Sequence, residues 1–187
     1  MKMILVTLLT VLITVGAGVC RTADPLSFTG CSDPSAAARI DGETFIVADD
    51  ETNVLRVYSI HSPEPVDFYD LSSYLHITDD HPEIDIEGSA KVGNKVYWIS
   101  SHGRNKDGKM RPNRYRFFAV DVTKDETALK ITPADDYTSR LAHRLVSDPK
   151  YVEYDLKKYT QFYSFFKDKD ELEKLAPKER GLNIEGL

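Results

Sequence analysis

Two stretches of the chain, "ARIDGETFIVA" (residues 38–48) and "AKVGNKVYWIS" (residues 90–100), align without a gap at an offset of 52 residues. Few letters are identical, but apolar positions coincide, as where Phe45 lies over Tyr97. Both stretches carry a two-letter turn signal near the middle, Asp-Gly in one and Gly-Asn in the other. Apolar, β-branched and aromatic letters on both sides of such a pair are typical of a β-hairpin, so the chain repeats one.

Each hairpin belongs to a longer series of strand candidates. They are short runs rich in Val, Ile, Phe and Tyr that end at Gly, Asp, Asn or Pro, which favours strands. The candidates lie at residues 35–40, 44–50, 53–60 and 65–71, and again at 88–92, 95–101, 114–122 and 127–131. The sequence therefore predicts an all-β fold. Its blade-like units of four strands, residues 31–76 and 85–132, are close to the roughly 40–45 residues of a β-propeller blade.

The last residues repeat the start of the second unit. "DIEG" opens that unit at Asp85, and "NIEGL" ends the chain at residues 183–187. This similarity predicts that a third unit begins at residue 183. Because a propeller closes with roughly four or more blades, we expect residues 28–187 to form an incomplete β-propeller-like domain, the N-terminal part of a longer protein. The alternative is a chance repeat at the end of a compact α+β domain.

A helical insertion is expected between the second unit and the third, at residues 137–180. Apolar and aromatic residues recur there at three- and four-residue steps, at Leu156, Tyr159, Phe162, Tyr163 and Phe166. That spacing predicts an amphipathic helix, which "KDKDELEKL" (residues 167–175) continues until Pro177 ends it. We expect this helix to pack against the rim of the propeller.

The N-terminus has the layout of a secretory signal peptide. A lysine at position 2 precedes an apolar run at residues 3–15, and small residues follow up to Gly18. The run is shorter than the roughly 20 residues of a membrane-spanning helix. We therefore predict a cleaved signal peptide at residues 1–20 and export to the periplasm or the extracellular space. An uncleaved anchor is the alternative, and lipid attachment at Cys20 is a poorer match because Val19 precedes it.

Composition excludes some functions. The formal net charge is −6, whereas a dedicated nucleic-acid binder needs a basic face. Apolar residues make up 41% of the chain, enough for an ordinary globular core. The two cysteines, Cys20 and Cys31, are too few for a disulfide framework, so the mature domain must rely on that core.

Three stretches carry a family resemblance: "CSDPSAAARIDGETFIVADDETNVLRVY" (residues 31–58), "DIEGSAKVGNKVYWISSHGRNKDGKMRPNRYRFFAVDV" (residues 85–122) and "NIEGL". They resemble an uncharacterised bacterial family, domain of unknown function 3616, from about residue 28 to the end. Within them, "SHGRNKDGKMRPNR" (residues 101–114) is the most specific part. The resemblance implies an exported β-propeller-like scaffold that continues past residue 187. It implies no reaction, because the family has none established. A looser likeness is to exported propellers with phytase-like or esterase-like labels.

Carboxylates recur where the units begin. They are Asp33, Asp85, Glu87 and Glu185, with Asp49 and Asp50 at the end of a strand. The innermost strands of a propeller line its central channel, so acids at the starts of those strands would converge on one mouth. Oxygen ligands of this kind suit Ca²⁺ or Mg²⁺, and we predict the unit-start acids as a metal site with Ca²⁺ as the candidate ion. Alternatively, each carboxylate accepts backbone hydrogen bonds and fixes the contact between blades.

A basic loop follows the second hairpin. Six cations surround the single acid Asp107; they are Arg104, Lys106, Lys109, Arg111, Arg114 and Arg116. Guanidinium groups grip phosphate or carboxylate at two points. The first five of these cations are therefore predicted to bind an anionic small molecule or glycan, such as a sugar phosphate. The alternative is a solvated loop, or one paired with acids such as Asp49, Asp50 and Glu51.

His102 is a candidate general base, because histidine titrates near neutral pH. The adjacent Ser100 and Ser101 invite comparison with a serine hydrolase. However, neighbouring residues on a strand point to opposite faces, and the chain has no Gly-x-Ser-x-Gly motif. A hydrogen-bonded loop histidine is the ordinary alternative.

Three functions stay open: an exported protein that binds an anionic small molecule or glycan, a metal-dependent hydrolase of phosphoesters, esters or lactones, and an inactive fragment of a longer protein. Whether the chain is an enzyme is undecided by these patterns. We expect no nucleic-acid partner, no membrane contact after signal cleavage, and contacts with further C-terminal blades of the same chain.

Overall fold

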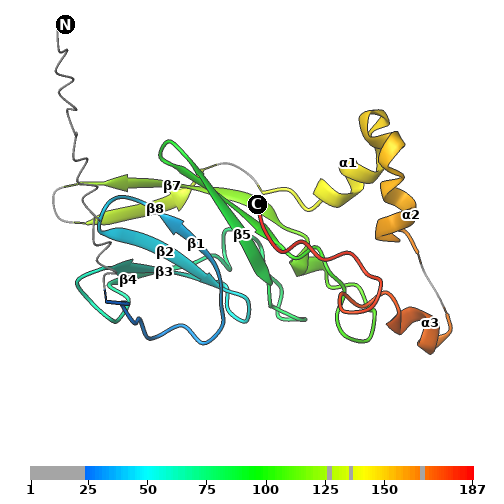
Figure 1. The fold of residues 1–187 in the computed structure, drawn as a ribbon, viewed down its shortest axis with the longest axis horizontal. Helices are drawn as coiled ribbons and strands as arrows, with labels where there is room; N and C mark the ends of the chain where they lie inside the picture. Colours follow the sequence, from blue (N-terminus) through cyan, green and yellow to red (C-terminus); the bar gives the residue numbers. More distant parts are fainter. Residues whose placement is uncertain (1–23, 126–127, 135–136, 165–166) are drawn as a thin grey trace, which may run out of the picture.

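The computed structural model describes residues 24–125, 128–134, 137–164 and 167–187. The predicted signal peptide at residues 1–20 and Phe166 lie outside this part of the chain. The prediction of an all-β fold is confirmed, because the described residues form two four-stranded antiparallel sheets with a few short helices (Figure 1). Among these residues no helix has the length and apolar character to span a membrane.

Each sheet is a meander in which consecutive strands are neighbours. The first sheet consists of β1 (Pro34–Arg39), β2 (Thr44–Asp49), β3 (Val54–Ser59) and β4 (Asp67–Asp70). The second consists of β5 (Ile86–Val92), β6 (Lys95–Ser100), β7 (Phe117–Lys124) and β8 (Leu129–Pro133). All eight strands overlap the runs that the sequence predicts.

The two sheets share an irregularity in their first strands. The pairing of β1 with β2 shifts by one residue between Pro34 and Ala36, and that of β5 with β6 shifts between Ile86 and Gly88. A bulge of this type inserts an extra residue and redirects side chains. The bulges lie 52 residues apart, at the same offset as the sequence repeat.

The turns of the two hairpins differ. Gly93, with φ of +62°, and Asn94 form a two-residue turn in the second hairpin. In the first, the Asp41 carboxylate accepts hydrogen bonds from the backbone N–H groups of Glu43 and Thr44, both at 2.8 Å, and holds a longer turn. Cross-strand partners beyond the turns therefore differ by one residue from those that the gapless alignment implies.

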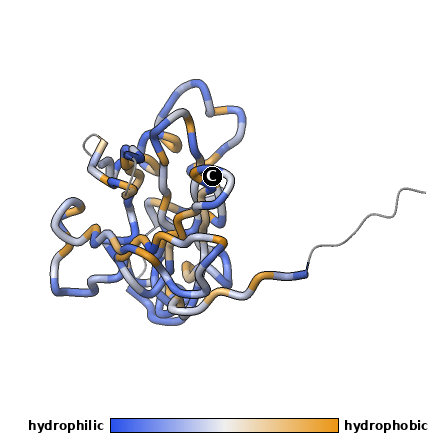
Figure 2. Tube along the Cα trace, turned by 90° about the vertical axis from the view of Figure 1, so that its left-hand side faces the viewer, coloured by the Kyte–Doolittle hydropathy of each residue, from blue (hydrophilic) through white to orange (hydrophobic). Residues whose placement is uncertain are grey.

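The sheets pack side by side through β1 and β5. The Ser89 hydroxyl donates to the Ala37 carbonyl at 2.8 Å, and the Ser35 hydroxyl donates to the Ile86 carbonyl. One hydrophobic core spans both sheets and contains Ile46, Leu55, Ile86, Trp98 and Phe118. Each such side chain contributes about 1.5–3 kcal/mol by leaving water. The peripheral loops are mainly hydrophilic (Figure 2).

The segment after β8 is helical but broken. It contains α1 (Leu141–Ser147), the 3₁₀ turn η2 (Pro149–Tyr154), α2 (Leu156–Thr160) and α3 (Lys169–Glu173). The prediction of one helix from Leu156 to Pro177 is wrong. Gln161 adopts a left-handed conformation, with φ of 49°, and ends α2, while the Thr160 hydroxyl accepts from the N–H of Phe162 at 3.3 Å. Short helices α1 and α2 lie together beyond one end of the sheets (Figure 1).

The last residues, 183–187, run beside β5 (Figure 1). The N–H of Ile184 donates to the Ser101 carbonyl at 2.8 Å. Gly88 faces the backbone of Gly186 and Leu187 so closely that a β-carbon on it would lie 2.7 Å from either. The first "IEG" of the sequence, residues 86–88, therefore lies against the second, residues 184–186.

Candidate functional site

An open cleft of about 1460 Å³, including its solvent-filled part, lies beside the start of β5. Its walls come from the loop after β6, which contains the 3₁₀ turn η1 (Pro112–Arg114), and from residues 176–185. Acidic lining residues are Asp50, Glu83, Asp85, Glu87, Glu179 and Glu185, and basic ones are Arg104, Lys106, Arg111, Arg114 and Lys178. The structure thus brings most of the predicted acidic set and most of the basic loop to one place.

Three carboxylates converge in the cleft. Asp50, Asp85 and Glu87 each offer an oxygen, and these oxygens all lie within 4.8 Å of one another. Asp50 follows the end of β2, Asp85 precedes β5, and Glu87 is the extra residue of the β5 bulge. Because the two sheets join through β1 and β5, acids from both sheets meet at this end.

Asp85 is the most firmly held of the three. Its backbone is left-handed, with φ of 62°, and its carbonyl accepts from the N–H of Ser101 at 2.8 Å. Its carboxylate accepts from the Ser101 hydroxyl and pairs with the Arg114 guanidinium at 3.0 Å. Arg114 also pairs with Glu83, whose pKa is nevertheless raised by burial against the opposing effect of Arg114.

The pKa values of Glu87 and Asp50 are both raised by their surroundings in the cluster. Burial, followed by the negative charges of Asp85, Glu185 and Asp50, raises the pKa of Glu87 to about 7. Burial and neighbouring acids, Asp33 first, also raise the pKa of Asp50. One Asp50 oxygen is buried and accepts no hydrogen bond from any described residue. The cluster therefore holds more negative charge than Arg114 can balance.

Asp49 plays a different part, although it is the neighbour of Asp50. It is fully buried and accepts from the Cys31 thiol at 3.3 Å and from the backbone N–H groups of Glu51 and Thr52 at 3.0 and 3.2 Å. Burial acts to raise its pKa, but these hydrogen bonds, that of the thiol first, lower it. Burial and the contact with Asp49 raise the pKa of Cys31 to about 11. Asp49 therefore ties the N-terminal segment to β2.

Among the predicted metal ligands, Asp33 lies near enough to Asp50 to raise its pKa but does not line the cleft. Glu185 lines the cleft at its exposed side and accepts from the side chain of Asn183. The converging carboxylates are therefore Asp85 and Glu87 of the predicted set, joined by Asp50.

The six cations of the basic loop differ in their surroundings. Arg104 and Arg116 are buried and bond mainly to backbone carbonyls, and Arg114 is paired with acids. Lys106 and Arg111 line the cleft without a carboxylate partner among the described residues. Lys109 is exposed and does not line the cleft.

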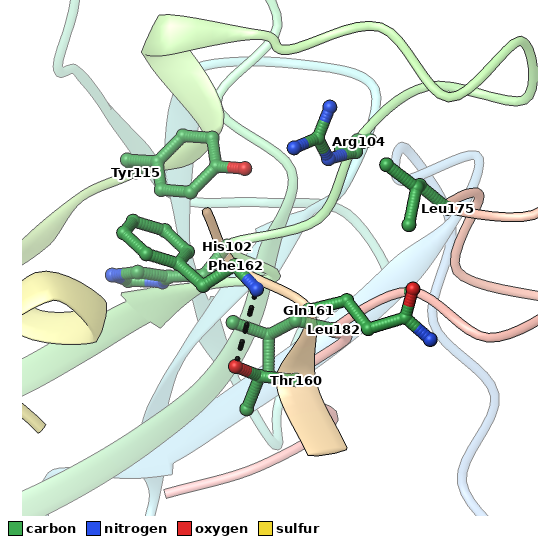
Figure 3. Close-up of a pocket in the computed structure, with 9 residues that line it drawn as sticks. His102, Arg104, Tyr115, Thr160, Gln161, Phe162, Leu175 and Leu182 are labelled. Carbon is green, nitrogen blue, oxygen red and sulfur yellow. Dashed lines mark hydrogen bonds between the residues drawn. The ribbon is translucent and has the colours of Figure 1, made fainter. Parts of the chain in front are cut away.

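His102 lies away from the carboxylates. It is buried, lines a smaller pocket and adopts φ of 52° (Figure 3). Its Nδ1 lies 2.8 Å from the Ser100 carbonyl, so Nδ1 carries the proton of a neutral ring, and burial lowers its pKa. The Ser100 hydroxyl donates to the Arg116 carbonyl at 2.9 Å and that of Ser101 donates to Asp85, so the hydrogen bonds of the two serines lead away from His102.

Three charged residues of the cleft were not predicted from the sequence: Glu83, Lys178 and Glu179. Lys178 and Glu179 belong to no motif that the sequence analysis uses, and their place in the cleft depends on the fold of residues 176–185. Glu83 had a signal, because Glu83, Asp85 and Glu87 alternate in "EIDIEG", and alternate residues of an extended segment share a face.

Comparison with known families gives one result. The family model described as "Protein of unknown function (DUF3616)" matches residues 33–187, which include both sheets and every residue of the cleft. Searches of curated proteins and of solved structures give no significant match. The family predicted from the three quoted stretches is confirmed: the chain belongs to the DUF3616 proteins of unknown function.

Proposed function

We propose that the cleft binds a small anionic molecule together with a divalent cation. One observation carries the proposal: three converging carboxylates and the cations Lys106 and Arg111 line the same cleft. A ligand with an acidic group satisfies both halves, because the group bonds to the cation on one side and to the basic side chains on the other.

The carboxylates suit a hard divalent ion. Asp50, Asp85 and Glu87 provide oxygens close enough to share one ion, and Glu185 stands near them. Ca²⁺ takes about six to eight oxygens and accepts water and ligand oxygens in the remaining positions. A divalent cation also removes the repulsion that raises the pKa of Glu87. Ca²⁺ is therefore our first candidate.

The basic wall suits a phosphate or a carboxylate. Lys106 and Arg111 from the loop after β6, and Lys178 from the C-terminal segment, line the cleft. Arg binds such groups at two points and Lys as a point charge. The ligand class that we propose is a sugar phosphate or an acidic glycan.

We propose a β-propeller-like scaffold for this site. Three observations support it: β1 and β5 adjoin, their bulges repeat at the same offset, and residues 183–187 lie beside β5 as β5 lies beside β1. In this arrangement the first strands surround a central channel, and the carboxylates lie at one of its mouths. We further propose that the protein acts after export, because its first 20 residues have the layout of a signal peptide.

Calorimetric titration tests the proposal. Chelator-treated protein is titrated with CaCl₂ and then, in saturating calcium, with glucose 6-phosphate and galacturonate. We expect one calcium site, roughly 10–100-fold weaker in Glu87→Gln, and an anion affinity that depends on calcium and falls in Arg111→Ala. Asp121→Asn, which changes a surface acid paired with Lys95 on the second sheet, is the control that leaves both affinities unchanged. If titration of the wild-type protein with CaCl₂ gives no heat of binding, the proposal that the cleft binds a divalent cation is refuted.

A metal-dependent hydrolase is the second candidate, because the pKa of Glu87 lies near 7 in an accessible cleft. A group with such a pKa suits general acid–base catalysis. In this candidate Asp50 and Asp85 hold the ion and Glu87 moves the proton. Hydrolysis of p-nitrophenyl phosphate, p-nitrophenyl acetate and a lactone should then be lost in Glu87→Gln. It should persist in His102→Gln, which lies outside the cleft; binding without turnover excludes this candidate.

A further inference from the structure

A second cavity, the inner pocket, lies between the loop after β6 and the helical segment (Figure 3). It measures about 210 Å³, including the part open to solvent, and is far smaller than the cleft. Its polar walls come from His102, Arg104, Tyr115, Thr160 and Gln161. Phe162 completes an aromatic wall, with ring centroids 5.6 Å apart between His102 and Tyr115 and 5.9 Å apart between Tyr115 and Phe162.

Arg104 brings a buried positive charge to this pocket. The residue is 8% exposed, and its two terminal nitrogens donate to the carbonyls of Gly108 at 3.0 Å and Ser164 at 2.7 Å. No carboxylate of the described residues lies within ion-pair distance of it. Burial lowers its pKa, with only Tyr115 acting in the other direction. A guanidinium buried without an anion is costly, since neutral carbonyls compensate only part of its lost hydration.

The remaining walls supply no countercharge. His102 is neutral, because burial and then the charge of Arg116 lower its pKa against the opposing effect of its hydrogen bond to the Ser100 carbonyl. Burial raises the pKa of Tyr115, so its hydroxyl stays protonated. Thr160 and Gln161 are uncharged, and the described lining of the inner pocket contains no acid. The pocket therefore carries a net positive charge.

The size of the pocket selects the class of ligand. Only a small part of the 210 Å³ is enclosed. That enclosed part accepts a group about the size of a water molecule and is too narrow for a phosphate ester or a sugar. We propose that the inner pocket binds a small monatomic anion, a halide such as chloride, against the Arg104 guanidinium. This site is separate from the carboxylates of the cleft, although Arg104 lines both cavities and stands between them.

Anion-dependent stability tests the proposal. Thermal unfolding is measured in sodium chloride, sodium bromide and sodium gluconate at equal ionic strength, so that screening is constant. For wild-type protein we expect the Tm in either halide to exceed that in gluconate by roughly 3–6 °C when the halide is about tenfold above its Kd. Arg104→Lys and Arg104→Gln should unfold at the same temperature in all three salts.

Arg116 provides a matched control. It is 6% exposed, donates to the carbonyls of Pro112 and Tyr115, and stacks 4.8 Å from the ring centre of Tyr137, yet it lines neither cavity. Arg116→Lys should lose stability but keep the halide dependence. Equal Tm values of the wild-type protein in all three salts, or loss of the halide dependence in Arg116→Lys as well, would overturn the proposal.

A structural measurement decides the case without a variant. Crystals of the wild-type protein soaked in sodium bromide should show an anomalous peak beside Arg104 in the inner pocket. A soaked crystal with bromide elsewhere and only water at Arg104 would leave that residue as an internal tie between Gly108 and Ser164, and would contradict the proposal.

Discussion

The position of Glu87 in the acidic cluster follows directly from the bulge in β5. It is the extra residue of the β5 bulge, which places its carboxylate beside those of Asp85 and Asp50. The same sequence position in the first unit holds Ser35, which instead bonds to the carbonyl of Ile86 and joins the sheets. Equivalent positions of the repeat therefore serve packing in one unit and charge in the next.

The raised pKa of Glu87 has a definite sign for stability. The folded protein keeps the proton up to a pH of about 7, whereas an unfolded glutamate loses it near 4.5. Folding therefore takes up a proton between these values, and the wild-type protein loses stability as the pH rises through this window. Urea unfolding at pH 4.5 and 7.5 should show a larger loss in wild type than in Glu87→Gln. Saturating calcium at pH 7.5 should restore the stability that the wild-type protein loses on going from pH 4.5 to 7.5. Equal losses of stability in the wild-type protein and in Glu87→Gln would contradict the raised pKa of Glu87.

Alanine variants of two adjacent serines can distinguish a residue that orients Asp85 from one that only stabilises the fold. Ser101 and Ser100 are both fully buried, but the hydroxyl of Ser101 donates to the Asp85 carboxylate and that of Ser100 donates to the Arg116 backbone carbonyl. Both alanine variants should lose stability. The loss should be about 1.5–3 kcal/mol in Ser101→Ala, which removes a bond to a charged group, and about 0.5–1.5 kcal/mol in Ser100→Ala, which removes a bond to a neutral one. Calcium affinity should fall roughly tenfold only in Ser101→Ala. Equal calcium affinities in the two variants would show that Ser101 does not orient Asp85.

At the scale of elements, short runs of β-branched and aromatic residues that end at turn residues sufficed to predict all eight strands. The bulges escaped, because an extra residue in β5 leaves the pattern of letters almost unchanged. The break after α2 escaped because Gln161 is left-handed without being glycine. The acidic cluster was predicted in part: the repeat identified Asp85 and Glu87, but the contribution of Asp50 depends on how the two sheets meet.

The contact between β5 and the last residues can be tested with two glycines. A β-carbon at Gly88 would lie 2.7 Å from the backbone of Gly186, whereas one at Gly186 would meet no atom within 4 Å. Gly88→Ala should therefore displace residues 183–187, and Gly186→Ala should not. Hydrogen exchange of the Ile184 amide, which is bonded to Ser101, should accelerate only in Gly88→Ala. Calcium affinity should fall in the same variant if Glu185 assists the site.

At the scale of the whole molecule, the proposed cation connects the two sheets. Asp50 follows the last residue of β2 in the first sheet, Asp85 directly precedes β5 in the second, and Glu87 lies in β5. The same two sheets already share a core around Trp98. A cation held by both should therefore stabilise the sheets together.

The only tryptophan of the chain, Trp98 in β6, reports on the second sheet. Calcium at about 100-fold its Kd adds about 2.7 kcal/mol of stability, so the Tm followed by tryptophan fluorescence should rise by roughly 5–10 °C. Asp50→Asn changes only the first sheet, yet it should abolish that rise in the second, because the ion loses a ligand that links them. Asp121→Asn, in the second sheet but outside the cleft, should keep it. A calcium shift that survives in Asp50→Asn would place any bound ion on the second sheet alone and disprove the link.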